Sequence, residues 1–260
     1  MIKMSELCQW LHEQLEQLPL IKYPFKLEIL PENGIYFFYE EGEFWGHFGK
    51  KLRIVRVGTH RDGNFRSRIK EHFLLDQAWM NFDENKPKPS DRSIFRKNIG
   101  RALLNKNTDE YLKIWEIDFM TRKNRKMYSA LRDIEKEKKI EEAVTKILRE
   151  NFFFRFIYLD PKIERIGSKG LESSLIGTLA NCRLCKPSAN WLGNYSPVRK
   201  IRESGLWLVQ HLKSKPIDER EKAIILNAIE ETKGWLIRKV FARQFLKVYS
   251  RHEWPGLIRP

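Results

Sequence analysis

The clearest chemical pattern in the chain is a tyrosine, a histidine and two basic side chains near its N-terminal end. Gly34-Ile35-Tyr36 and Val57-Gly58-Thr59-His60 each border an apolar run, and Arg68 and His72 follow them four residues apart. Residues at this spacing on a helix share a face, so Arg68 and His72 can address one phosphate group. A phenol and a cation on two strands, beside a cation and an imidazole on a helix, suit hydrolysis of a phosphodiester bond.

Two strands and a helix are needed to position these residues. Turn residues followed by aromatic and β-branched residues predict a strand, and helical spacing of apolar residues predicts the helix. The predicted elements are a turn over Pro31–Gly34, a strand over Ile35–Tyr39, a hairpin loop over 40–51, a return strand over Leu52–Val57 ending at Gly58, and a helix holding Arg68 to Leu74 after a turn at Asp62–Asn64.

Changes of pattern divide the rest of the chain. Lys86–Ser90 is typical of a linker, and the block around it carries both signs of charge with helical periodicity. Phe152–Leu159 is predicted to be a buried third strand, followed by a helix from Leu171. We predict an N-terminal helical lead-in (1–30), a core (31–80 and 151–196), a charged, mostly helical insertion (81–150) and a basic helical C-terminal extension (197–260).

The composition favours a polyanionic partner. Lys and Arg number 49 against 34 Asp and Glu, which gives a net charge of +15. Nucleic acid fits this excess, and an anionic membrane surface is the competing interpretation. No apolar run approaches the roughly 20 residues of a membrane span, and the N-terminal segment has no signal-peptide pattern. We therefore expect a cytoplasmic protein, neither membrane-spanning nor secreted.

Three cysteines, Cys8, Cys182 and Cys185, are too few and too unevenly placed for a disulfide framework. Cys182 and Cys185 form one Cys-x-x-Cys, which is half of a structural zinc site. Only Cys8 and scattered histidines remain for the other half. We expect thiols here rather than a zinc site.

The C-terminal segment carries a periodic row of cations. Lys239, Arg243, Lys247 and Arg251 recur every fourth residue within a helical pattern. Such a row could follow a phosphate backbone. The alternative is an ordinary solvated helix face.

Taken together, these motifs resemble those of the GIY-YIG nuclease family. The first half of its signature is intact at Gly34-Ile35-Tyr36, whereas Arg56-Val57-Gly58 stands where the family usually has Tyr-Ile-Gly or Tyr-Val-Gly. The resemblance covers about half of the chain, chiefly 30–75 and 152–195. Three further segments are similar to a large-insert branch of the family: Ser93–Arg96, Trp191–Gly193 and Ser204–Trp207.

This resemblance implies a fold and an activity. The fold would be α+β, a small three-stranded antiparallel sheet flanked by helices, with a large helical insertion and a helical extension. The activity would be that of a divalent-metal-dependent endonuclease in restriction or structure-specific repair, with double-stranded DNA as the first expected substrate. The missing second tyrosine also allows a catalytically inactive nucleic-acid-binding protein. The sequence leaves the oligomeric state open.

The resemblance also implies site roles. Arg68, His72 and Glu172 match the family's arginine, histidine and single catalytic glutamate, and Asn190 matches the asparagine that follows a Lys-Pro element. A lone carboxylate with water and substrate oxygens suits Mg²⁺ or Mn²⁺, so Glu172 is the expected metal anchor. Tyr36 is the expected base, assisted by Arg56 and His60. His60 is the rival base, since an imidazole titrates near neutral pH.

Overall fold

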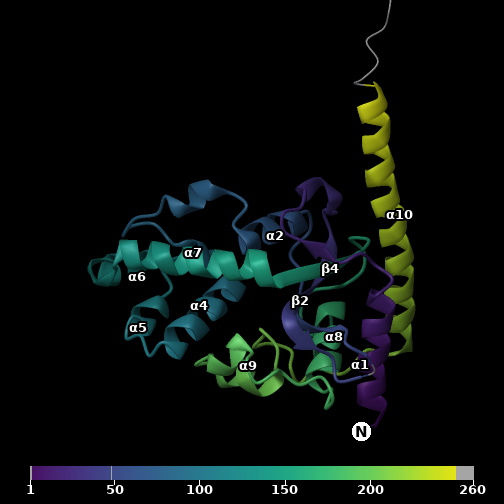
Figure 1. Ribbon diagram of the computed structural model, residues 1–260, viewed down its shortest axis with the longest axis horizontal. Helices are drawn as coiled ribbons and strands as arrows, with labels where there is room; N and C mark the ends of the chain where they lie inside the picture. The colour runs from purple at the N-terminus through teal and green to yellow at the C-terminus, as the bar shows by residue number, and fades with distance from the viewer. Residues whose placement is uncertain (1, 48, 250–260) are drawn as a thin grey trace, which may run out of the picture.

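The fold is built around one small antiparallel sheet, shown with its surrounding helices in Figure 1. The computed structural model describes the backbone of residues 2–47 and 49–249 and the side chains of residues 5–47 and 49–239. The strands lie in the order β1-β4-β2-β3. Their bounds are Ile21–Lys22 for β1, Gly34–Phe44 for β2, Leu52–Gly58 for β3 and Phe152–Tyr158 for β4.

Helices surround this sheet and make up most of the remaining structure. The longer ones are α1 (Ile2–Leu15), α2 (Phe65–Phe73), α4 (Ile94–Lys106), α6 (Arg122–Tyr128), α7 (Ile134–Asn151), α8 (Leu171–Ala180), α9 (Arg199–Ser204) and α10 (Glu219–Tyr249). Shorter helical turns are α3 (Pro89–Arg92), α5 (Leu112–Trp115) and 3-10 turns at Leu27–Ile29, Gln77–Met80, Ser129–Leu131 and Leu192–Tyr195. The predicted α+β fold is confirmed.

Two details of the sheet differ from the prediction. A fourth strand, β1, pairs with β4 through only two residues, which is too short to show a periodic pattern. β2 continues to Phe44, where a loop was predicted from residue 40. Glu40, at the start of the predicted loop, is instead buried in the strand and accepts hydrogen bonds from the indoles of Trp191 and Trp207, at 2.8 and 2.9 Å. β2 therefore includes Glu40, a buried carboxylate with two tryptophan partners, and continues beyond it.

The two faces of the sheet carry separate apolar clusters. Alternation along β2 turns Ile35 and Phe37 to one face and Tyr36 and Phe38 to the other. The first face packs against α1, α8 and α10, and the second packs against α2, α4 and α7. Burial of each large apolar side chain contributes about 1.5–3 kcal/mol. Tyr36 thus lies on the face covered by α2.

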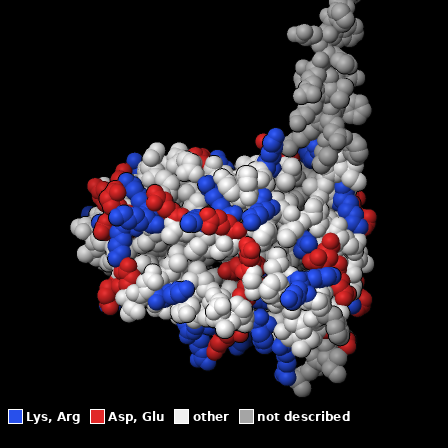
Figure 2. Space-filling model, viewed as in Figure 1, with Lys and Arg blue, Asp and Glu red and all other residues white. Residues whose placement is uncertain are grey.

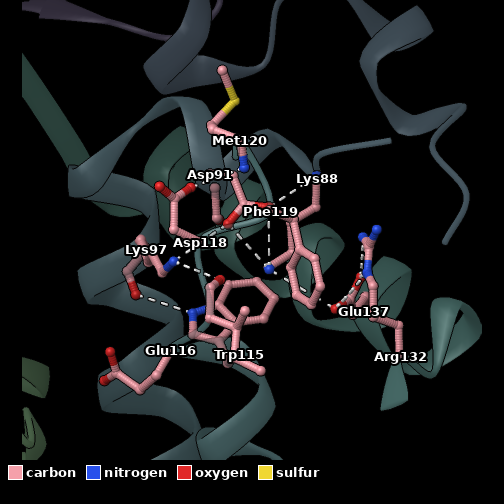
Figure 3. A network of polar contacts seen from close by, with 12 residues as sticks. Lys88, Asp91, Lys97, Trp115, Glu116, Asp118, Phe119, Met120, Arg132 and Glu137 are labelled. Carbon is pink, nitrogen blue, oxygen red and sulfur yellow. Dashed lines mark hydrogen bonds and ion pairs between the residues drawn. The ribbon is translucent and has the colours of Figure 1, made fainter. Parts of the chain in front are cut away.

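The helices between β3 and β4 form a lobe that lies to the left of the sheet in Figure 1. Ion pairs without solvent exposure hold its centre, as Figure 3 shows. Lys88 Nζ lies 3.2 Å from Asp91 Oδ1 and 4.8 Å from the ring centroid of Trp115, while Arg132 and Glu137 approach to 2.6 Å. Removing one member of such a pair leaves an uncompensated buried charge, so these contacts specify how the helices meet.

A second buried pair connects the rest of this lobe to α2, the helix that covers one face of the sheet. Arg96 of α4 donates to Glu141 Oε2 of α7 at 2.7 Å, and both side chains are fully buried. The same guanidinium donates to the main-chain oxygen of His72 at 3.0 Å. The lobe therefore fixes the position of α2.

Helix α10 crosses the first face of the sheet and runs along the right side of the molecule in Figure 1. Thr232 Oγ1 accepts a hydrogen bond from the main-chain N–H of Tyr158 at 2.8 Å, and the rings of Tyr158 and Trp235 stack. Basic and acidic side chains are interspersed over the face drawn in Figure 2. Within the described part of the chain, no helix combines the length and apolar character needed to cross a bilayer.

Candidate active site

Tyr36 lies at the start of β2, directly opposite Gly58 of β3. Its ring passes over the glycine: a Cβ on Gly58 would lie 2.1 Å from Tyr36 Oη. A residue without a side chain is therefore required opposite the phenol. The side chain is almost wholly enclosed, with 1% of Tyr36 exposed. The spacing of the two predicted motifs reflects this cross-strand contact.

Arg56 reaches the same site from β3. Its guanidinium lies 4.8 Å from the ring centroid of Phe95 and donates to the main-chain oxygen of Trp207. Burial lowers the pKa of Arg56, and the neighbouring oxygen of Tyr36 opposes this shift. Arg56 Nε is buried without a hydrogen-bond partner among the described residues. A cation with an unused donor therefore stands beside the phenol.

Arg68 faces the phenol from α2. Its Nη1 donates to Glu71 Oε2 at 2.7 Å and to the main-chain oxygen of Arg92 at 2.9 Å. Burial acts to lower the pKa of Arg68, but the Tyr36 oxygen and Glu71 outweigh it and raise the pKa overall. The side chain is 15% exposed, so it can meet a ligand from solvent.

His72 holds the phenol from the next turn of α2. The ring is neutral because burial, and then the nearby guanidinium groups, hold the pKa of His72 well below its usual value. Buried Ser93 Oγ accepts from the main-chain N–H of Arg96, and its own hydrogen is satisfied by donation to His72 Nδ1 at 2.8 Å. The ring proton then lies on Nε2, which donates to Tyr36 Oη at 2.9 Å.

Glu172 approaches from the first turn of α8. Its Oε1 accepts the main-chain N–H of Thr59 at 3.2 Å, and no described residue forms a hydrogen bond with the second oxygen. Burial raises the pKa of Glu172, and the positive charge of Arg56 and the proximity of His211 oppose the rise. None of the described cations forms an ion pair with it within 4.0 Å. The carboxylate thus keeps space and an oxygen for a further ligand.

His60 lies at the edge of this group, just beyond the end of β3. Its pKa is lowered by partial burial and then by the charge of Arg68, so the imidazole is available as a neutral base. No described residue forms a side-chain hydrogen bond with it. His60 lies near Arg68 and His72, since each of these pairs is electrostatically coupled, and its role as the base stays a prediction.

Asn190 lies apart from the other predicted residues. It is exposed in the loop before the 3-10 turn Leu192–Tyr195, and it forms no side-chain hydrogen bond to a described residue. Its neighbour Trp191 contacts Glu40, four residues along β2 from Tyr36. The catalytic role of Asn190 stays a prediction.

The row of C-terminal cations is largely outside the described residues. Lys239 Nζ lies 4.6 Å from the ring centroid of Trp235 on α10. The side chains of Arg243 and Lys247, and the whole of Arg251, lie outside the described residues. A nucleic-acid-binding role for this row stays a prediction.

Three supporting residues were not predicted as members of the site. Ser93 orients His72, Thr59 contacts Glu172 through its amide, and the proximity of His211 acts on the Glu172 carboxyl. Ser93 could have been found only as the capping residue of a helix, because its side chain accepts the Arg96 amide. His211 comes from a distant loop and could not be placed from spacing.

The prediction for the cysteines is wrong in one respect. The other half of a metal site is present, because Cys8 and His47 join Cys182 and Cys185. One ligand atom from each residue lies within 4.8 Å of all the others. The sequence conceals this group, since its members come from three distant segments.

Comparison with known proteins gives one match. The family model described as GIY-YIG domain matches residues 3–234. No curated protein and no solved structure matches the chain.

Proposed function

The chain belongs to the GIY-YIG domain family, and from this premise we propose that it is a divalent-metal-dependent endonuclease that hydrolyses phosphodiester bonds in DNA. The family supports a nuclease-type function in general. The metal, the site residues and the DNA substrate are our proposals.

The observation that carries the proposal is that three further elements bring side chains to the site of Tyr36 on β2. β3 brings Arg56, α2 brings Arg68 and His72, and α8 brings Glu172. Two guanidinium groups can bind the non-bridging oxygens of a phosphate, since their planar forks match its geometry. Both would stabilise the charge that develops during hydrolysis.

The donor set at Glu172 fits a hydrated Mg²⁺ or Mn²⁺ ion. Such an ion requires oxygen ligands and keeps several waters, so one carboxylate suffices as the protein ligand. Glu172 has a free oxygen and no ion pair in the described part of the chain. A divalent ion held there would supply charge stabilisation to the phosphate and to the departing 3′ oxygen. Burial beside Arg56 keeps the carboxylate in place.

Tyr36 is the proposed base. In its phenolate form it accepts the proton of the attacking water. Its Oη lies 2.9 Å from His72 Nε2, and the side chains of Arg56 and Arg68 lie beside it, so the three groups hold the phenol in position. Arg56 thereby assists where relatives with the usual signature have a second tyrosine. His60, which is partly buried near Arg68, is the alternative base.

Double-stranded DNA is the proposed substrate, in restriction or in repair of branched structures. The net charge of +15 supports a polyanionic partner. Restriction predicts cuts at defined sequences in linear duplex, whereas repair predicts cuts at junctions whatever their sequence. Cleavage of both substrate classes by the purified protein separates the two roles.

The experiment that tests the activity is cleavage of supercoiled plasmid with Mg²⁺ and then with excess chelator. We expect metal-dependent nicking that Glu172→Gln removes while DNA binding is retained. Glu164→Gln is the matched control, because Glu164 is an exposed carboxylate just before α8. Binding without cutting by the wild-type chain, across DNA and RNA substrates, would favour a catalytically inactive binding protein instead.

A further inference from the structure

A second group of metal-binding side chains lies at the other end of the β2–β3 hairpin. Cys8 belongs to α1, His47 to the hairpin turn, and Cys182 and Cys185 to the segment after α8. All four ligand atoms lie within 4.8 Å of one another. We call these four residues the cysteine cluster.

Two distances within the cysteine cluster are those of a tetrahedral site. Cys8 Sγ and Cys185 Sγ are 3.8 Å apart, and Cys182 Sγ and His47 Nε2 are 3.7 Å apart. A tetrahedral zinc ion with ordinary bond lengths separates two sulfurs by about 3.8 Å, and a sulfur and a nitrogen by about 3.6 Å. The observed edges match both values.

A main-chain amide is directed at one sulfur of the cysteine cluster. The main-chain N–H of Gly46 donates to Cys185 Sγ at 3.5 Å. A Cβ on Gly46 would lie 1.8 Å from the Leu184 main-chain oxygen, so the hairpin turn and the Cys182–Cys185 segment meet backbone to backbone. Such contact leaves the amides free to address sulfur, the outer-shell arrangement that tunes a metal site.

A second histidine, His12, lies close to the cysteine cluster, but both of its ring nitrogens have main-chain partners. His12 Nδ1 lies 2.8 Å from the Cys8 main-chain oxygen, and Nε2 accepts the main-chain N–H of Ile54 at 3.1 Å. Both nitrogens are therefore used. His12 Nδ1 also lies 3.6 Å from Cys8 Sγ, but His47 is the histidine whose nitrogen lies within 4.8 Å of all three sulfurs.

We propose that the cysteine cluster binds one structural zinc ion through three thiolates and His47. Four protein ligands close the coordination sphere and leave no position for substrate, which is the mark of a structural site. Three thiols and an imidazole are soft donors that select zinc over Mg²⁺. The ion joins α1, the hairpin turn and the end of α8, three segments that are far apart along the chain.

The test is metal analysis of the full chain, purified under reducing conditions without added metal. One zinc per chain is expected in the wild type, with loss of bound zinc in Cys182→Ser and His47→Ala. Ser5→Ala is the matched control and should keep its zinc, because Ser5 Oγ lies 4.0 Å from Cys182 Sγ but is not a ligand. Zinc-free wild-type protein, or zinc retained by both ligand variants, would overturn the proposal.

A second experiment uses the wild-type chain, so it tests the site even if the ligand variants fail to fold. Wild-type protein stripped of zinc and loaded with Co²⁺ should give the intense visible absorption of a tetrahedral thiolate complex, and added zinc should bleach it. A weak octahedral spectrum, or a disulfide between two of the cysteines in protein never exposed to oxidant, would contradict the site. Glu172→Gln should give the wild-type cobalt spectrum, so failure of the zinc site and failure of the nuclease site are distinguishable.

Discussion

The two ends of the β2–β3 hairpin are built for different tasks. At the Gly34 end a single carboxylate with a free oxygen faces two guanidinium groups. At the turn end, three thiols and an imidazole contact one another closely. Helix α8 connects them, with Glu172 in its first turn and Cys182 just beyond its last, about 15 Å along the axis. One end leaves ligand positions for a substrate, and the other leaves none.

The contrast shows how a buried site is kept accessible. The phenol and imidazole of the proposed nuclease site are enclosed, while Arg68 and His60 stay partly open to solvent. The turn end needs no access and can be fully saturated by protein ligands. We therefore propose that catalysis takes place at the Gly34 end and that the turn end has a structural role.

The largest expected effect comes from the phenol. Tyr36→Phe should lower the single-turnover cleavage rate by about 10²–10⁴-fold, the range for loss of a general base. His60→Ala should cost less, and neither change should alter the zinc content. Near-normal cleavage by Tyr36→Phe, with activity lost in His60→Ala, would transfer the base role to His60.

A pair of glycine substitutions separates the two ends directly. Gly58→Ala forces the Tyr36 phenol to move, so cleavage should fall by about 10²-fold with zinc retained. Gly46→Ala pushes the hairpin turn away from Leu184 and should weaken zinc binding instead. Cleavage rate and zinc content, measured for both variants, check this. If both variants lost cleavage activity and bound zinc to the same extent, the two ends of the hairpin would not have separate functions.

The Mg²⁺ requirement of cleavage at the Gly34 end should depend on pH. Burial raises the pKa of Glu172, so as pH falls through that raised value the carboxyl is protonated and can no longer bind the metal. The Mg²⁺ concentration for half-maximal cleavage should then rise about tenfold for each further pH unit. Metal titrations at a series of pH values measure it. A requirement that is flat through and below the ordinary glutamate range would contradict metal binding by Glu172.

A smaller effect is expected from Ser93, which acts through His72. Ser93→Ala removes one hydrogen bond, worth about 1 kcal/mol, and should slow cleavage about fivefold. The pH profile of cleavage should shift as well, because the ring is no longer held in one tautomer. Ser93→Thr keeps the hydroxyl and should restore both. A fivefold loss with an unchanged profile in Ser93→Ala would indicate a purely structural role.

The smallest effect on chemistry is expected from loss of zinc. Cys182→Ser should lower the melting temperature by about 2–4 °C for each kcal/mol of binding free energy lost, while cleavage well below that temperature stays near the wild-type rate. Thermal unfolding with and without added zinc measures the shift. If Cys182→Ser were folded but unable to cleave DNA, the turn end would have to take part in catalysis.

The sequence predicted the parts of this molecule that depend on local pattern. The strands around Tyr36 and Arg56 and the helix of Arg68 and His72 follow from alternation and helical spacing. Glu40 was assigned to a loop because its two tryptophan partners lie more than 150 residues away. Long-range partners of this kind leave no trace in a local pattern.

The same limit explains the two sites. The order of Tyr36, Arg68 and Glu172 could be recognised because the family signature fixes it. The cysteine cluster has no such signature: Cys8 and His47 are single residues in α1 and in the hairpin turn. Only the packing of α1 against α8, together with the backbone contact between Gly46 and Leu184, brings them to the Cys-x-x-Cys pair.

The most direct test is anomalous diffraction from crystals of the protein with an uncleavable DNA duplex, soaked in Mn²⁺. The account predicts a manganese peak beside the free oxygen of Glu172, within reach of a phosphate held by Arg56 and Arg68. A duplex bound with its phosphate at these residues but with no manganese at Glu172, or with manganese held by other residues, would contradict it.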